Sequence, residues 1–129
     1  MTELEKRLMS AIGLCMKAGK LASGEFAAEK ALKSGGKLAI VDEDASENTK
    51  KQWQDACAFR NVPIVFVREL GFAIGKSARM TAVVTDEGFK KMIISAAEKV
   101  RAERVSTDDE SIGDRDMQNV HYTEADIND

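Results

Sequence analysis

The sequence contains little histidine, and this scarcity argues against most hydrolytic and nucleophilic enzyme mechanisms. Its single histidine, His121, lies in the acidic C-terminal segment. A Ser/His/Asp or Cys/His arrangement would have to use that residue. The sequence also lacks a GxxxxGK[ST] phosphate-binding loop and a GxGxxG dinucleotide-binding loop. We therefore expect a protein with no catalytic residues and no cofactor.

Cysteine is equally scarce, and its placement argues against a zinc site. Cys15 and Cys57 lie far apart and neither belongs to a CxxC motif. Both lie among apolar residues with helical spacing, so we expect buried, reduced thiols. The acidic run Asp42–Asp44 could supply oxygen ligands to a metal. A solvated loop that also caps the next helix explains the run better.

No apolar run approaches the ~20 residues that a membrane-spanning helix needs. The segment from Met1 to Cys15 mixes charges of both signs in an amphipathic pattern, which does not fit a secretory signal. These absences predict a cytoplasmic protein without a membrane partner. The composition, 43% hydrophobic and 32% charged over 129 residues, is typical of one soluble globular domain.

Charge is distributed unevenly along the chain. Residues 1–104 carry 18 Lys and Arg against 14 Asp and Glu, a net charge of +4, whereas residues 105–129 carry one Arg against eight acids, a net charge of −7. The second segment also has no sustained apolar period. We predict that residues 1–104 form the folded, mildly basic domain and that residues 105–129 are a disordered or loosely attached tail.

Hydrophobic periodicity predicts alternating helices and strands. Helices are expected over residues 3–17, 24–34, from a cap at Asp44 or Ser46 to about Arg60, 69–74, and from a cap at Thr85 or Asp86 past Val100. Strands are expected over 21–23, 38–42, 64–67 and 81–85. The longer strands are continuous apolar runs alternating with helices. The pattern predicts an α/β fold, a three-layer α/β/α sandwich with a small mixed sheet.

In two of the expected helices, named residues recur at helical spacing. The second helix places Phe26, Ala27, Lys30 and Ala31 at turn spacing. For the last helix, the apolar set is Phe89, Met92, Ile93, Ala96 and Val100.

The stretch KAGKLASGEFAAEKALKSG, residues 17–35, places cations and glycine where the second helix begins. Unpaired N–H groups at a helix start, together with the helix dipole, favour an anionic oxygen. Ser23 and Gly24 would form that start, and glycine would let a ligand approach the backbone closely. The neighbouring cations are Lys20, Lys30 and Lys33. The alternative is an ordinary helix entry beside a solvated basic face.

A second candidate element is the loop GKSARMT, residues 75–81, just before the last strand. It combines Lys76 and Arg79 with the apolar Met80. Cations that contact phosphates, beside an apolar surface for a base, would suit RNA. The sequence alone favours RNA contact by this loop no more than it favours a solvated loop that only connects a helix to a strand.

Five segments occur together in an order that resembles a known family. They are KAGKLASGEFAAEKALKSG, KLAIVDEDASENTKK, NVPIVFV, ELGFAIGK and TAVVTDEGF, within residues 4–100. Their order resembles the bacterial YlxQ-like branch of the kink-turn-binding ribosomal-protein superfamily. The resemblance implies the α/β/α fold and RNA binding. It also implies that the start of the second helix and the loop before the last strand together hold a sharply bent RNA.

The chain departs from that family at the residues that read bases. The family motif is Gly, a variable residue, Asn or Lys, Glu or Gln, two variable residues and Lys. Gly24 and Lys30 match it, whereas Phe26 and Ala27 replace the polar pair. Ala27 cannot form a hydrogen bond with a base edge. We therefore expect RNA binding through phosphate and shape, with altered kink-turn discrimination, and Glu25 is a candidate substitute base contact.

The leading function is thus a non-catalytic protein that binds structured RNA of ribosomal or another type. A protein-interaction module on the same fold, with no direct RNA contact, is the main alternative, because the polar pair is missing. A third interpretation is the isolated recognition domain of an RNA-modifying enzyme. The tail's charge of −7 would compete with RNA for the basic domain.

Overall fold

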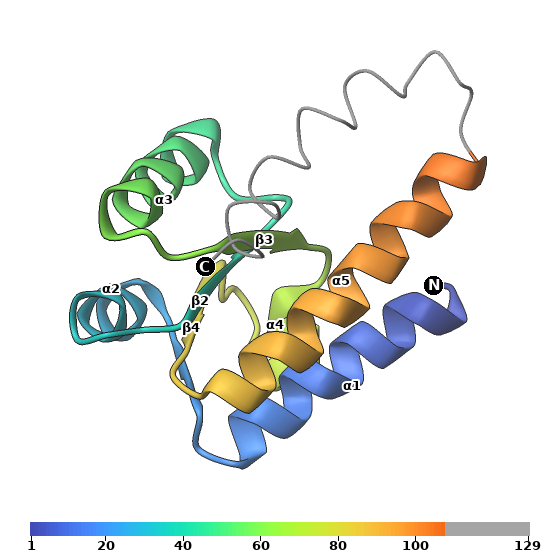
Figure 1. Cartoon of the computed structure of the whole chain (residues 1–129), viewed down its shortest axis with the longest axis horizontal. Helices are drawn as coiled ribbons and strands as arrows, with labels where there is room; N and C mark the ends of the chain where they lie inside the picture. Colours follow the sequence, from blue (N-terminus) through green and yellow to red (C-terminus); the bar gives the residue numbers. More distant parts are fainter. Residues whose placement is uncertain (108–129) are drawn as a thin grey trace.

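Figure 1 shows the computed structural model of the chain, in which residues 1–107 are described. The helices are α1 (Glu3–Lys17), α2 (Glu25–Lys33), α3 (Glu47–Arg60), α4 (Leu70–Ile74) and α5 (Glu87–Thr107). The strands are β1 (Leu21–Ser23), β2 (Leu38–Asp42), β3 (Ile64–Val67) and β4 (Thr81–Val84). This order matches the predicted one. Helix α5 continues three residues past the predicted boundary at residue 104, and residues 108–129, most of the predicted tail, lie outside the described part.

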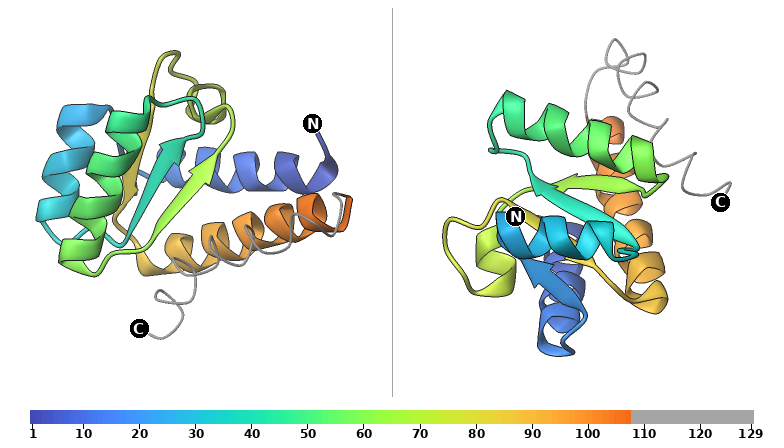
Figure 2. Two further views of the ribbon diagram at one scale, coloured as in Figure 1. Left: turned by 90° about the horizontal axis from the view of Figure 1, so that it is seen from above. Right: turned by 90° about the vertical axis from the view of Figure 1, so that its left-hand side faces the viewer.

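The strands form one mixed sheet with the order β1-β4-β2-β3. Strands β2 and β3 are parallel, and β4 runs antiparallel to both of its neighbours, β1 and β2. Helices α2 and α3 cover one face of the sheet, and α1, α4 and α5 cover the other (Figures 1 and 2). The predicted three-layer α/β/α sandwich with a small mixed sheet is confirmed.

The alternating side chains of the central strands contribute to two hydrophobic cores, one on each face of the sheet. Every residue of β2 and β4 is buried, as their continuous apolar runs predict. Along β2, Leu38 and Ile40 pack with α1, α4 and α5, whereas Ala39 and Val41 pack with α2 and α3. Successive side chains point to opposite faces of a strand, so one short segment supplies both cores.

Structure and sequence spacing differ on two helices. Helix α2 buries Ala28 and Leu32, whereas the Phe26 side chain is 83% exposed. The residues that share the helical spacing of Phe26 therefore lie mainly on the solvent-exposed face of α2. The helix packs on the sheet through Ala28 and Leu32 instead. In α5, Ile93 and Val100 are buried as expected, but Met92 is 48% exposed and Ile94 is buried in its place.

Both cysteines are buried and free, one in each core, as predicted. Burial raises the pKa of the Cys57 thiol to about 12. Burial, and then the nearby carboxylate of Asp86, raises the pKa of Cys15 to about 11. Both thiols are therefore protonated near neutral pH, so neither is a ready nucleophile or metal ligand.

Asp42, in the acidic run after β2, does not belong to a solvated loop. It is buried, and its two carboxylate oxygens accept N–H groups from Asp44 at 2.8 Å and from Leu70 at 2.9 Å. The expectation of a solvated loop is therefore wrong at Asp42, which ties the end of β2 to the start of α4. Ser46 caps α3 by accepting the N–H of Thr49.

Candidate nucleic-acid interface

Among the described residues, the first N–H groups of α2 have no internal acceptor. Gly24 precedes the helix with a φ of 94°, and its own N–H donates to Thr81 O at 3.0 Å. In the described part of the chain, no side chain caps this end of the helix. Within residues 1–107, no hydrogen bond joins the N–H of Glu25, Phe26 or Ala27 to a protein acceptor, and all three residues are exposed. These donors are available to an external anion.

Arg79 joins the loop before β4 to this helix start. Its Nη1 donates to Ser23 O at 3.1 Å, across 56 residues of sequence. The guanidinium lies so close to Gly24 that a Cβ at residue 24 would overlap Nη1. The positive φ of Gly24 favours glycine, and a side chain there would also push the Arg79 guanidinium away from Ser23. A cation, rather than a carboxylate, stands beside the uncapped helix start.

The rest of the loop is anchored through its backbone. Lys76 N–H donates to Gly71 O at 2.9 Å, and Met80 O accepts the N–H of Asp42 at 2.9 Å. These bonds leave the side chain of Lys76 exposed and that of Met80 38% exposed. A fixed backbone with outward side chains is suited to presenting a cation and an apolar surface to a ligand.

Exposed aromatic side chains flank both elements. Phe26 follows Gly24 by two residues and is 83% exposed, and Phe72 on α4 is 76% exposed. An isolated exposed apolar side chain is common on a protein surface. Phe26 lies at the start of α2, and Phe72 lies on α4, the helix that leads into the loop, so both segments carry an exposed aromatic side chain.

The structure keeps Lys30 in this region and separates Lys20 and Lys33 from it. Lys30 is exposed one turn after Phe26 and Ala27, so it belongs to the same surface of α2. Lys33 lies in the last turn of α2 and approaches Glu29 to 3.9 Å. Lys20 precedes β1, and its O accepts the N–H of Thr85 at 3.0 Å. Thr85 follows β4, whereas Arg79 precedes β4, so Lys20 and Arg79 lie toward opposite ends of that strand.

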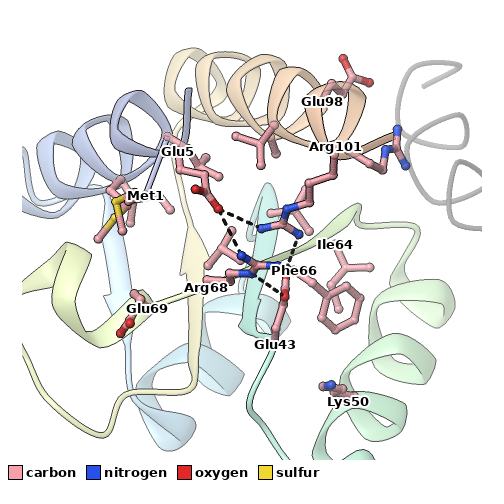
Figure 3. Close-up of a pocket in the computed structure, with 18 of the residues that line it drawn as sticks. Met1, Glu5, Glu43, Lys50, Ile64, Phe66, Arg68, Glu69, Glu98 and Arg101 are labelled. Carbon is pink, nitrogen blue, oxygen red and sulfur yellow. Dashed lines mark hydrogen bonds and ion pairs between the residues drawn. The ribbon is translucent and has the colours of Figure 1, made fainter. Parts of the chain in front are cut away.

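A separate hollow of about 710 Å³ lies beside β3 and α5 and contains a closed ring of ion pairs (Figure 3). Arg104 contacts Glu43 at 2.9 Å and Glu5 at 3.3 Å, and Arg68 contacts the same two carboxylates at 3.4 and 3.6 Å. A hydrogen bond from Thr2 N–H, followed by the two arginines, lowers the pKa of Glu5. These charges compensate each other within the protein.

No sequence pattern predicts this ring, and among the basic residues near the C-terminal ends of α2 and α3 the sequence indicates only Lys33. Lys37, Arg60 and Lys90 line a second hollow together with Lys33. No local motif marks any of these groups, because each set is assembled from distant segments. The position of Arg79 in a basic loop marks it as a candidate phosphate contact. Its hydrogen bond to Ser23 O is visible only in the structure.

Comparisons with known proteins agree with this architecture. Residues 6–94 match the model of the ribosomal protein L7Ae/L30e/S12e/Gadd45 family. The "RNA-binding protein YlxQ" of Bacillus subtilis is 41% identical over 88 residues, 65% of this chain and 88% of that protein. Its namesake in Enterococcus faecium is 37% identical over 90 residues, 67% of this chain and 86% of that protein.

Solved structures give the same picture. A protein of unknown function from Bacillus halodurans has a TM-score of 0.67 at 32% identity, over 71% of this chain and 97% of that one. The Giardia lamblia 15.5 kD RNA-binding protein has a TM-score of 0.60 at 22% identity, over 79% and 91% of the two chains, and supports the fold alone. The resemblance to the YlxQ-like branch is confirmed.

Proposed function

Because the chain belongs to the ribosomal protein L7Ae/L30e/S12e/Gadd45 family, we propose that it is a non-catalytic, cytoplasmic protein that binds structured RNA. The RNA is held where α2 begins and where the loop 75–80 meets it. The observation that carries the proposal is the Arg79 guanidinium, fixed on Ser23 O beside uncapped helix N–H groups. The names of the Bacillus and Enterococcus relatives support the same class of ligand.

The chemistry of this surface suits phosphate oxygens. The N–H groups of Glu25, Phe26 and Ala27 supply directed donors, and the α2 dipole adds partial positive charge. Arg79 supplies a planar guanidinium held in place by its own hydrogen bond. Lys30 on α2 and Lys76 in the loop are exposed and add further positive charge. Glu25 is the acid in the first turn of α2, and its carboxylate could accept hydrogen bonds only from donor groups of a base or ribose.

Base recognition at this surface relies on stacking more than on hydrogen bonds. Ala27 presents only a methyl group, and Phe26 presents an exposed ring beside it. An aromatic face stacks on any unpaired base, typically with about 1–3 kcal/mol and with little sequence preference. The RNA is therefore selected by its bent shape and phosphate positions, with weaker discrimination among bases than the family motif gives.

Filter binding of a kink-turn RNA and an unbent duplex of equal length tests the proposal. We expect tighter binding of the bent RNA, and an affinity for both that falls as salt rises, because phosphate contacts release counterions. No binding to either RNA, or affinity independent of salt, would contradict the proposed function.

A protein-interaction module is the second candidate, and the exposure of Phe26 where the family has a polar residue favours it. Exposed aromatic side chains are frequent anchors in protein interfaces. Affinity capture before and after nuclease treatment separates the two functions. A partner that survives nuclease supports the protein interaction, whereas a partner lost with the RNA supports RNA binding.

A further inference from the structure

A second basic surface lies at the other end of α2, in a shallow hollow of about 740 Å³. Its charged lining residues are Lys33, Lys37, Arg60, Lys90 and Glu87. Four cations therefore face one acid. Asn61 at the end of α3 adds an exposed amide. We call this set, together with the nearby Lys20, the basic end.

The topology of the sheet brings these residues together. Lys37 directly precedes β2 and donates its N–H to Val84 O at 2.7 Å, on one side of β4. Lys20 directly precedes β1 and accepts the N–H of Thr85 at 3.0 Å, on the other side of β4. The two lysines therefore flank the end of one strand, within about two strand spacings, or roughly 10 Å, of each other.

The positive charge of the basic end is only partly compensated. Glu87 approaches Lys90 to 3.6 Å and Glu29 approaches Lys33 to 3.9 Å, and both contacts are long and partly solvated. Within residues 1–107, no carboxylate lies within ion-pair distance of Lys37 or Arg60. Arg60 instead lies over the exposed ring of Phe59, at 6.0 Å from its centroid.

Helix dipoles explain part of this pattern but not all of it. Lys33 and Arg60 lie in the last turns of α2 and α3, where cations are stabilised by the helix dipole. Lys37 lies in the connection before β2, and Lys90 lies in the first turn of α5, where a cation is disfavoured by the dipole. The convergence of these residues therefore indicates a ligand with repeated negative charge.

We propose that the basic end is a second phosphate-binding surface, which contacts the backbone of the RNA held at the start of α2. This inference rests on the proposed function. Helix α2 has nine residues, so its two ends are about 13 Å apart. Lys30 is exposed between them. An RNA whose stem extends along α2 contacts both surfaces, whereas a short RNA contacts only the first.

The test compares a short bent RNA with the same RNA carrying a longer stem. The variant Lys33→Gln/Lys37→Gln/Arg60→Gln removes three cations of the basic end. The control Lys51→Gln/Lys99→Gln/Arg7→Gln removes the same residue types from exposed positions on α3, α5 and α1. Each protein is titrated with each RNA over a range of salt, after thermal unfolding shows that all are folded.

We expect the basic-end variant to lose affinity for the long RNA and to lower the slope of log K against log salt by about 2, since each phosphate contact contributes roughly 0.7–0.9. Its binding of the short RNA should match the wild type. An unchanged slope with the long RNA, or an equal change in the control, overturns the second surface alone. Failure of the wild type to bind either RNA overturns the proposed function and this inference together.

Discussion

Two charged regions of the molecule differ in how their charges are compensated. The ring of Glu5, Arg68, Glu43 and Arg104 pairs each cation with two carboxylates, and it joins α1 and α5 to the loops beside β3. At the start of α2, within residues 1–107, Arg79 bonds only a backbone carbonyl and the adjacent N–H groups have no acceptor. Compensated charge indicates a structural role, and uncompensated donors indicate a ligand.

Reversal of the charge at Arg79 should have the largest effect on RNA binding. Arg79→Glu removes a charged donor and places an anion among the phosphate-binding groups. Charged hydrogen bonds contribute about 1.5–3 kcal/mol, so we expect affinity to fall roughly tenfold to more than a hundredfold. Arg7→Glu, on the exposed surface of α1, is the control. Equal losses in the two variants would show that only net charge matters.

Substitution of Gly24 should affect both stability and binding. Gly24→Ala forces a Cβ onto a residue with a φ of 94° and displaces Arg79. Gly35→Ala meets the same strain, with a φ of 93°, but in open space. Both should lose about 1–2 kcal/mol of unfolding free energy, and only Gly24→Ala should weaken RNA binding. Parallel urea unfolding and filter binding measure the two effects, and equal affinity of both variants would contradict the role of Arg79.

Disruption of the ring should change stability without changing RNA binding. Arg104→Met removes two ion pairs from a side chain that is 33% exposed. After allowance for solvent screening, we expect a loss of about 1–2 kcal/mol in urea unfolding. Arg7→Met, which breaks a long and exposed contact with Glu3, should cost less than about 0.5 kcal/mol. Reduced RNA affinity in Arg104→Met at unchanged fold would break the distinction between the two regions.

The ring should also confer a pH dependence in acid. The pKa of Glu5 is lowered in the folded state, by the Thr2 N–H and then by the arginines. Its contribution to stability is therefore present above the unfolded pKa of about 4.3 and is lost as pH falls through the lower folded pKa. The unfolding free energies of wild type and Glu5→Gln should differ near pH 7, and the difference should shrink as pH falls below the unfolded pKa of about 4.3. A difference that stays constant from pH 7 to the lowest pH at which the protein folds would refute this assignment.

Removal of residues 108–129 should give the smallest effect. This segment carries one Arg against eight acids, so its loss should raise RNA affinity by at most about 1 kcal/mol, roughly fivefold. The gain should shrink as salt rises to about 0.15 M, where the Debye length is about 8 Å. Affinity that is unchanged by the truncation at low salt would exclude competition between the tail and RNA.

The layers of the fold were predictable because the signals are local. Continuous apolar runs such as residues 38–41 can be buried on both faces only in a sheet covered by helices. Turn and cap residues then set the limits of each element, as Ser46 does for α3. The burial of Asp42 was not predictable, because its partner Leu70 is 28 residues away and the surrounding acids suggest solvent.

The candidate site was predictable only in part. The motif around Gly24 and the loop with Arg79 could be read as separate basic elements, but only the fold shows that Arg79 reaches Ser23. Lys20 is close to Gly24 in the sequence, which predicts that the two residues belong to one site. The direction of β1 places Lys20 beside Thr85 instead. Lys37 and Arg60 carried no sequence signal, since their proximity depends on how α2, β2 and α3 pack.

The most direct test of the central claim is an NMR titration of the isotope-labelled chain with a kink-turn RNA. We predict that the amide signals of Glu25, Phe26 and Ala27 and the side-chain N–H signal of Arg79 shift most, with saturation at one RNA per chain. Signals of those groups that stay in place, while RNA binding is shown by other residues or not at all, would contradict the account.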